Sequence, residues 1–218
     1  MGIIARRGCA CFGEFAAMNQ IEALSQIDKL GTLGFETRDI SALLRVSPAN
    51  ASMLLKRLAI SGFVYRVARG RWVRANQENR ERLVEQLAAP YPACISLQSA
   101  LFLHGLIEQV PAVIYAVTPG RARRFDTPLG SVSLHRIPPE LFGGFKISND
   151  GTKIATAEKA LFDLLYLSPT RSRLFASLPE LEVPKAFRWS EVRRWIEKIA
   201  AKNRRSFVER KAAVLKAA

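Results

Sequence analysis

The sequence is short of the residues on which catalytic and metal sites depend. Its 218 residues include only two histidines, His104 and His135, and three cysteines, Cys9, Cys11 and Cys94. So few cysteines do not form a disulfide framework, and this usage is typical of a reducing compartment. Cys9 and Cys11 could begin a metal site, but no matching Cys or His pair follows at ligand spacing. We therefore expect free thiols and no bound metal.

Membrane and export signals are also missing. No apolar run approaches the roughly 20 residues that a membrane span needs. The first residues carry arginines but no apolar core of signal-peptide length, and Arg6 stands where a myristoylation site requires Ser or Thr. We expect a cytoplasmic protein without a membrane partner. The first regular pattern begins at Met18, so we expect residues 1–17 to be a disordered leader or an overextended start.

No catalytic motif stands out. The sequence has no P-loop, no G-x-G-x-x-G and no H-E-x-x-H. Neither histidine has an adjacent nucleophile and carboxylate, and we expect His104 to be satisfied by a hydrogen bond in the core. The segment "ELFGGFK" has two glycines before a lysine, but it lacks the strand–loop–helix context of a phosphate site. We expect no catalytic residue, no cofactor and no enzyme.

Positive charge is what the sequence has in excess. The formal net charge is +14, and it is unevenly distributed. Residues 1–80 hold 12 Lys and Arg against 6 Asp and Glu, residues 81–170 hold 8 against 8, and residues 171–218 hold 13 against 5. Basic ends around a neutral middle indicate a polyanionic partner, nucleic acid above all. The alternative is a solvated basic surface that keeps the protein soluble.

Residues 18–75 predict three short helices and a hairpin. Apolar residues at helical spacing form a first helix that ends at Gly31. A second helix follows within "FETRDISALLRV", and we expect Thr37 to be its N-cap. Ser47 is the expected N-cap of the third helix, where Pro48 suits the first helical position because no backbone hydrogen bond is lost there.

The third helix has an apolar stripe and an opposite polar face. The outward side chains near its N-terminus are small or uncharged, and cations come a turn later. This order is typical of a recognition helix, whose early residues contact base edges and whose later cations meet phosphates. A solvated basic face is the alternative. The predicted base-contacting residues are Ser47, Asn50, Ser52 and Met53, and the predicted phosphate-binding residues of this helix are Lys56 and Arg57.

A basic hairpin follows the third helix. "FVYRV" and "RWVRA" predict two short strands, and Gly70 between them tolerates the positive φ that a tight turn needs. Arg69 and Arg71 then lie at the tip, where we expect them to contact phosphates or the minor groove. Three helices and a basic hairpin in this order resemble a winged helix-turn-helix. The order is more specific than any single element.

The second half predicts a mixed α/β domain, which makes the fold class α+β. Residues 76–90 predict a linker helix, and residues 91–218 the C-terminal domain. Ser96 and Thr156 are the expected N-caps of two helices in this domain. We expect residues 171–218 to form a tail of one or two basic amphipathic helices. Such a tail is a solvated face, a second DNA-contact surface, or a docking site for a dimer partner or RNA. A predicted basic loop carries Arg121, Arg123 and Arg124, which would extend the DNA-binding surface.

Two segments of this half, "SLQSALFLHGL" and "IATAEKALFDLLYL", resemble the AbiEi family, the antitoxins of the AbiE type IV toxin–antitoxin systems. They are separated by about the right length, and a predicted winged helix stands upstream as in that family. The resemblance covers most of residues 19–170. It implies a bacterial autorepressor that binds inverted repeats of double-stranded DNA in its own promoter. It also implies a nucleotidyltransferase-like toxin that the second domain neutralises, with or without a stable complex.

A reading of a different class stays open at this point. Residues 91–170 would house an enzyme or an enzyme regulator, and the winged helix would serve for protein contact. A third hypothesis is an RNA-binding module. It would be favoured if the tail alone binds RNA. Binding of the protein to its own upstream DNA at physiological salt would separate the leading hypothesis from both.

Overall fold

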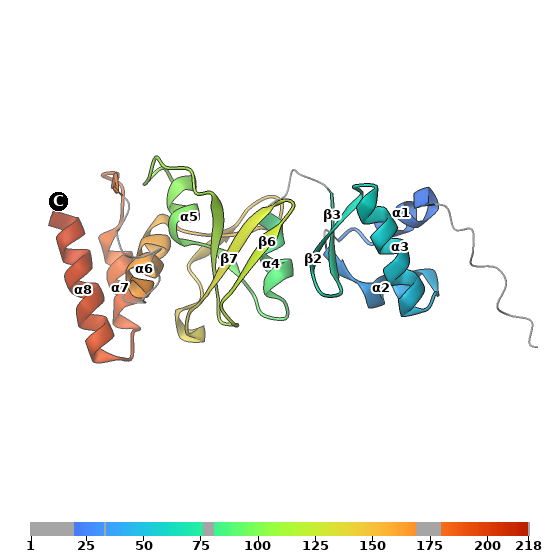
Figure 1. The fold of residues 1–218 in the computed structure, drawn as a ribbon. Helices are drawn as coiled ribbons and strands as arrows, with labels where there is room; N and C mark the ends of the chain where they lie inside the picture. Colours follow the sequence, from blue (N-terminus) through green and yellow to red (C-terminus); the bar gives the residue numbers. More distant parts are fainter. Residues whose placement is uncertain (1–19, 33, 76–80, 169–179, 218) are drawn as a thin grey trace, which may run out of the picture. The chain divides into compact units, whose positions relative to one another are not determined.

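The chain folds into two compact units, Met1–Ala75 and Asn76–Ala218, each with its own sheet (Figure 1). The computed structural model describes residues 20–32, 34–75, 81–168 and 180–217. The predicted leader, residues 1–17, lies outside the described residues. The class is mixed α+β, as expected from the sequence.

The first unit has three helices and a three-stranded antiparallel sheet in the order β1-β3-β2. The helices and the hairpin lie where the periodicity predicted them. The short strand β1 was not predicted, because three residues are too few to show an alternating pattern. The elements are α1 (Gln20–Asp28), β1 (Gly34–Glu36), α2 (Thr37–Leu44), α3 (Pro48–Ile60), β2 (Val64–Ala68) and β3 (Arg71–Arg74).

Apolar side chains from all three helices meet in one core. Ile27 of α1, Ile40 of α2 and Leu55 of α3 are fully buried, and Trp72 of β3 closes the cluster from the sheet. Each of these helices turns one apolar stripe inward, so its opposite face is left to solvent. Burial of the stripe of α3 therefore fixes which of its residues point outward.

The start of α2 differs from the prediction. The N-cap is Glu36, whose backbone N–H donates to Asp39 Oδ2 at 2.7 Å, and Thr37 is the first helical residue. The Thr37 hydroxyl instead accepts a hydrogen bond from Trp72 Nε1 at 3.0 Å, and the Thr37 backbone N–H donates to the Gly70 carbonyl at 2.9 Å. The hairpin therefore takes the hydroxyl that was expected to cap the helix. The sequence pattern gave no sign that the hairpin lies next to α2. Thr37 thus fastens the hairpin to the second helix.

The second unit is built on a six-stranded mixed sheet in the order β6-β7-β5-β4-β9-β8. The pairs β5–β7 and β4–β9 are parallel, and the other neighbours are antiparallel. Its elements are α4 (Leu83–Ala88), β4 (Cys94–Ile95), α5 (Leu97–Leu103), β5 (Val113–Thr118), β6 (Arg123–Thr127), β7 (Gly130–Arg136), the 3-10 helix η2 (Pro139–Leu141), β8 (Phe145–Ile147), β9 (Lys153–Ala155), α6 (Ala157–Leu167), α7 (Trp189–Glu197) and α8 (Lys202–Ala217).

Two elements of this unit differ from their predicted form. Helix α4, expected within a linker, packs against β4, β5 and β7 and buries Leu83, Val84 and Leu87. Its apolar side therefore belongs to the second unit. The stretch predicted as a basic loop contains β6, which pairs with β7 and carries Arg123 and Arg124 at the edge of the sheet.

The predicted basic tail forms two helices that pack onto α6, side by side in Figure 1. Trp195 of α7 lies against the backbone of Gly143 and Gly144, where an added methyl group would come within 3.4 and 2.7 Å of its ring. The glycines of "ELFGGFK" therefore leave room for the indole ring of Trp195 to pack against the backbone. No described helix combines the length and the apolar composition that crossing a bilayer requires.

Candidate nucleic-acid interface

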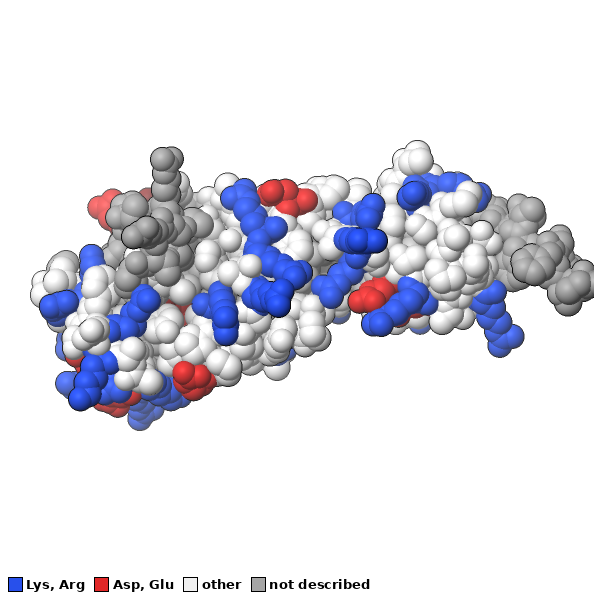
Figure 2. Space-filling model, turned by 60° about the horizontal axis from the view of Figure 1, so that its bottom comes forward, with Lys and Arg blue, Asp and Glu red and all other residues white. Residues whose placement is uncertain are grey.

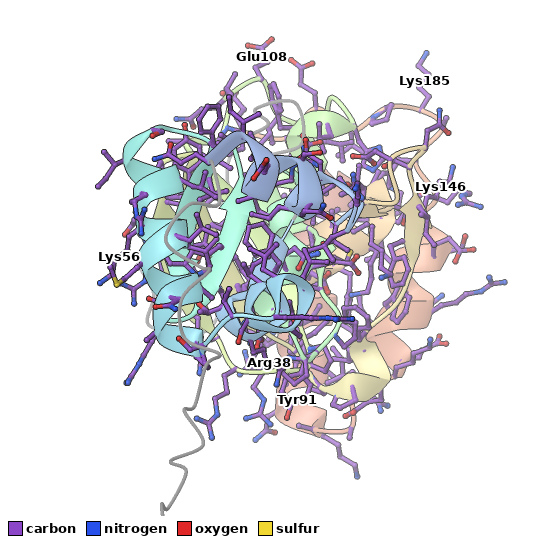
Figure 3. The ribbon with its side chains drawn as sticks, turned by 90° about the vertical axis from the view of Figure 1, so that its right-hand side faces the viewer. Arg38, Lys56, Tyr91, Glu108, Lys146 and Lys185 are labelled. Carbon is purple, nitrogen blue, oxygen red and sulfur yellow. The ribbon has the colours of Figure 1, made fainter. Side chains whose placement is uncertain are left out.

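The outer face of α3 carries the side chains that the sequence assigned to DNA. Met53, Lys56 and Arg57 are exposed, whereas Leu55 and Leu58 on the opposite side are fully buried. Figure 3 shows Lys56 on the outer side of this helix. The helix is supported from below by an apolar core, so it can be presented to a partner without rearrangement of the unit.

The four predicted base-contacting residues differ in how they stand on the helix. Ser47 is the N-cap, as predicted, and its hydroxyl accepts from the Asn50 backbone N–H at 3.2 Å. Ser52 is half-buried on the flank. Asn50 and Met53 are both exposed. Asn50 and Met53 are therefore the better placed of the four to touch a partner, and Ser47 mainly stabilises the start of the helix.

The structure separates the two arginines predicted at the hairpin tip. Arg69 is exposed in the turn between β2 and β3. Arg71 is half-buried in β3, and its Nε lies 3.7 Å from Glu36 Oε1. The carboxylate on β1 offsets part of the charge of Arg71, so Arg69 is the stronger candidate for a phosphate contact.

Sequence reasoning gave no role to several further cations on the surface of this unit. Arg38 is exposed near the start of α2, Arg66 is exposed on β2, and Arg45 occupies the turn between α2 and α3. Arg45 has φ of 51°, the left-handed conformation that ends α2 tightly, and the Ser41 hydroxyl donates to the Val46 carbonyl across the same turn. Alternation along β2 did not identify Arg66, because residues two apart on a strand share a face and Val64 is fully buried.

The second unit has a basic edge of its own. Arg121, Arg123 and Arg124 are all exposed, and the last two lie on the edge strand β6. Arg124 pairs with Asp126, with Nε 3.3 Å from Oδ1. Successive side chains of a strand point to opposite faces, so Arg123 and Arg124 leave the sheet on different sides. On the face of the molecule in Figure 2, Lys and Arg outnumber Asp and Glu.

A buried polar cluster in the second unit was not predicted. Lys159 and Asp163 of α6 form an ion pair with both side chains 0% exposed, and the Ser96 hydroxyl donates to Asp163 Oδ2 at 2.7 Å. Ser96 precedes α5, as expected, but its hydroxyl is given to Asp163 rather than to a helix cap. Thr156, in contrast, caps α6 as predicted by accepting from the Lys159 backbone N–H.

Aromatic rings complete the surroundings of this ion pair. The Lys159 ammonium lies 5.1 Å from the centre of the Phe162 ring and 4.8 Å from the centre of the Trp195 ring. Burial raises the pKa of Asp163, while the ammonium and the Ser96 hydroxyl favour its charged form. With no exposed surface, this cluster ties β4, α5 and α6 together and offers no access to a substrate.

A second ion pair connects α6 to the segment before α7. Arg188 donates from its backbone N–H and from Nε to Glu158 Oε1, at 3.4 and 3.3 Å. Burial opposes the charged form of Glu158, but backbone hydrogen bonds and the Arg188 guanidinium outweigh it and lower the pKa of this carboxyl. The charged form is therefore favoured by the fold.

The histidines and the described cysteine have structural partners. His104 is exposed, contrary to the expectation of a core position, and its Nε2 lies 2.7 Å from the Ala155 carbonyl. His135 lies beside the Ser133 hydroxyl, and burial lowers its pKa. Burial raises the pKa of the Cys94 thiol to about 12, so it stays protonated and unreactive near neutral pH.

In the described ranges, no group of three or more His, Cys, Asp or Glu side chains is arranged to hold a metal ion. The predicted free thiols Cys9 and Cys11 lie outside those ranges. No protein-family model matches this chain, and no curated protein matches it either. The kinship with the AbiEi antitoxins therefore stays a prediction from the residues of the two motifs.

Proposed function

We propose that the first unit is a winged helix-turn-helix that binds duplex DNA, with α3 in the major groove and the β2–β3 hairpin as the wing. One observation carries this proposal. The exposed side of α3 begins with uncharged side chains and continues with Lys56 and Arg57, above a core that holds the helix rigidly. The uncharged side chains would contact base edges, and Lys56 and Arg57 would contact phosphates.

The hairpin supports the same proposal. Its turn carries exposed Arg69, and Thr37 fastens it to the start of α2 through Trp72 and Gly70. A wing held at a fixed place relative to the helices can contact the phosphate backbone or the minor groove beside the major-groove helix. In the second unit, exposed Arg121, Arg123 and Arg124 would supply further phosphate contacts, and the basic helices α7 and α8 are another candidate for such contacts.

We infer further that the chain is the antitoxin and autorepressor of a type IV toxin–antitoxin system in the bacterial cytoplasm. This step is supported by the resemblance of "SLQSALFLHGL" and "IATAEKALFDLLYL" to the AbiEi family. These motifs form α5 and α6, which pack on each other through Ser96 and Asp163. The operator would be an inverted repeat bound by two copies, with half-sites near whole turns of roughly 10 bp. We assign no catalytic residue.

The DNA step is tested by fluorescence anisotropy with the DNA upstream of the gene and a scrambled duplex. With about 6–10 phosphate contacts, affinity should fall by roughly 10³–10⁵ between 50 and 200 mM salt. Arg69→Ala with Arg71→Ala should weaken binding to both duplexes, whereas Asn50→Ala should reduce the preference for the upstream DNA. Equal loss of discrimination in the two variants would contradict this division of roles.

The antitoxin step needs a separate measurement, because DNA binding and neutralisation are different activities. The neighbouring open reading frame should encode a nucleotidyltransferase, and co-expression with this chain should restore the growth that the enzyme inhibits. A variant with Arg57→Ala and Arg69→Ala should lose promoter repression and keep the rescue. If the upstream DNA is not bound, or the isolated protein prefers RNA, the winged helix serves RNA or protein contact and the proposal fails.

A further inference from the structure

We propose that α3 reads A·T base pairs, with Asn50 bound to an adenine and Met53 packed on the methyl group of a thymine. This inference rests on the proposed DNA-binding function and adds the bases that the helix recognises. It concerns the operator, which the fold alone does not define.

The exposure of Met53 is the first observation behind it. Its side chain is 55% exposed on a helix that buries Leu55 and Leu58 completely. A thioether is apolar and adaptable, so it gains little from water and much from contact with an apolar partner. In the major groove, the apolar group that a base pair presents is the thymine methyl.

The chemistry of Asn50 is complementary. Its amide carries a donor and an acceptor side by side, which match N7 and N6 of adenine in the major groove. Guanine is most often read by Arg or Lys, and the first two turns of α3, residues 48–55, contain neither. Lys56 is the first cation of the helix, and it stands beyond the base-contacting turns. The early face of α3 therefore suits A·T pairs rather than G·C pairs.

The spacing of the two side chains limits how far apart the bases can be. Residues three apart on a helix have Cβ atoms about 5–6 Å apart and advance about 4.5 Å along the axis. Base pairs are stacked about 3.4 Å apart. Asn50 and Met53 therefore contact the same base pair or adjacent ones. Each half-site should contain one or two consecutive A·T pairs at its contacted centre.

The test begins with selection from a duplex library of random sequence by the full-length protein. The enriched duplex is then resynthesised with deoxyuridine for one thymidine at a time, which removes only the methyl group. One such replacement should weaken binding about fourfold, the value of one buried methyl-sized group. Replacement of the contacted adenine by 7-deazaadenine removes N7 and should weaken binding about fivefold or more.

Variants then assign each effect to its side chain. Met53→Ala should bind the thymidine and deoxyuridine duplexes equally well, and Asn50→Ala should lose the sensitivity to 7-deazaadenine. Ile60→Ala is the matched control, because Ile60 is an aliphatic residue of the same helix, 87% exposed and seven residues further on. It should keep both effects. All three positions are exposed, so the variants should fold normally, which circular dichroism can verify.

Two results would overturn the inference while leaving the DNA-binding proposal intact. One is an enriched half-site whose contacted centre consists of G·C pairs. The other is binding that is insensitive to deoxyuridine at every thymidine of the enriched site. A library that yields no enriched sequence, with no binding to any duplex, would instead overturn the DNA-binding proposal itself.

Discussion

The two units of this chain put their charged side chains in opposite places. In the described part of the first unit the buried side chains are apolar, and Lys56, Arg57 and Arg69 reach solvent. In the second unit Lys159 and Asp163 are completely buried together with Ser96. An apolar core leaves surface cations available to a partner, whereas a buried polar network fixes one arrangement of the elements around it. The contrast predicts that substitutions of charged residues damage the second unit and spare the first.

The largest effect is expected for Lys159→Met. It leaves the Asp163 carboxylate buried without its ammonium, and the free energy of unfolding of the second unit should fall by about 3–5 kcal/mol. Urea unfolding followed by hydrogen exchange with mass spectrometry measures the two units separately. Lys159→Met with Asp163→Leu removes both charges and should cost less than the single substitution. If the double variant loses at least as much free energy of unfolding as Lys159→Met alone, an unpaired buried charge is not the cause of the loss.

A smaller effect is expected where α7 meets the glycines before β8. Gly144 has φ of 68°, and an added Cβ would lie 2.7 Å from Trp195 Cζ2, so Gly144→Ala should cost about 2–4 kcal/mol. Gly151→Ala is the control. Gly151 also has positive φ, 86°, but no atom lies within 4 Å of the added methyl. Its cost should be only that of backbone strain, about 1–2 kcal/mol. Equal thermal destabilisation of both variants would exclude the indole contact as a cause.

Within the first unit, the most sensitive polar position should be Thr37. Thr37→Val keeps the shape of the side chain but leaves the buried Trp72 indole N–H without its acceptor, which should cost about 1–3 kcal/mol. DNA binding should weaken in parallel, because the hairpin loses one of its links to α2. Thr37→Ser keeps the hydroxyl and should retain both stability and affinity. Loss of affinity in the serine variant would point to a steric role of the methyl group instead.

The smallest effect concerns pH and Glu158. The folded state lowers the pKa of this carboxyl below its ordinary value of 4.5, so its contribution to stability is present above that pH and is lost as the pH falls through the folded value. The second unit should therefore lose stability below about pH 4.5 less steeply in Glu158→Gln than in the unmodified chain. Identical pH profiles would mean that the pair with Arg188 contributes nothing.

In each unit, the sequence predicted the regular elements better than the long-range contacts within the unit. Three helices and a hairpin follow from periodicity, and the outward position of Met53 and the flanking position of Asn50 follow from the stripe of α3. The ion pair of Arg71 was missed because its partner, Glu36, lies on β1. This strand has only three residues, and it is distant in sequence from β3, with which it pairs. Local patterns carry no information about such contacts.

The buried ion pair was missed for another reason. Charged residues four apart on a helix are normally solvated, and the sequence pattern gave Lys159 and Asp163 no role as a pair. One signal could have corrected this. Helix α6 is apolar around most of its circumference, and a helix that is hydrophobic all round is a buried helix. Nine of the eleven residues of α6 are indeed buried, so a charged side chain on this helix needs a partner.

The contact of Trp195 with two lysines has a practical consequence. The Lys198 ammonium lies 3.9 Å from the centre of the indole ring, and the Lys159 ammonium lies 4.8 Å from it. The emission of an indole responds to nearby charge, so this residue is an intrinsic optical reporter of how firmly α7 is seated. In a variant that keeps Trp195 as its single tryptophan, a ligand that lifts the C-terminal helices would shift the tryptophan fluorescence, without any attached dye.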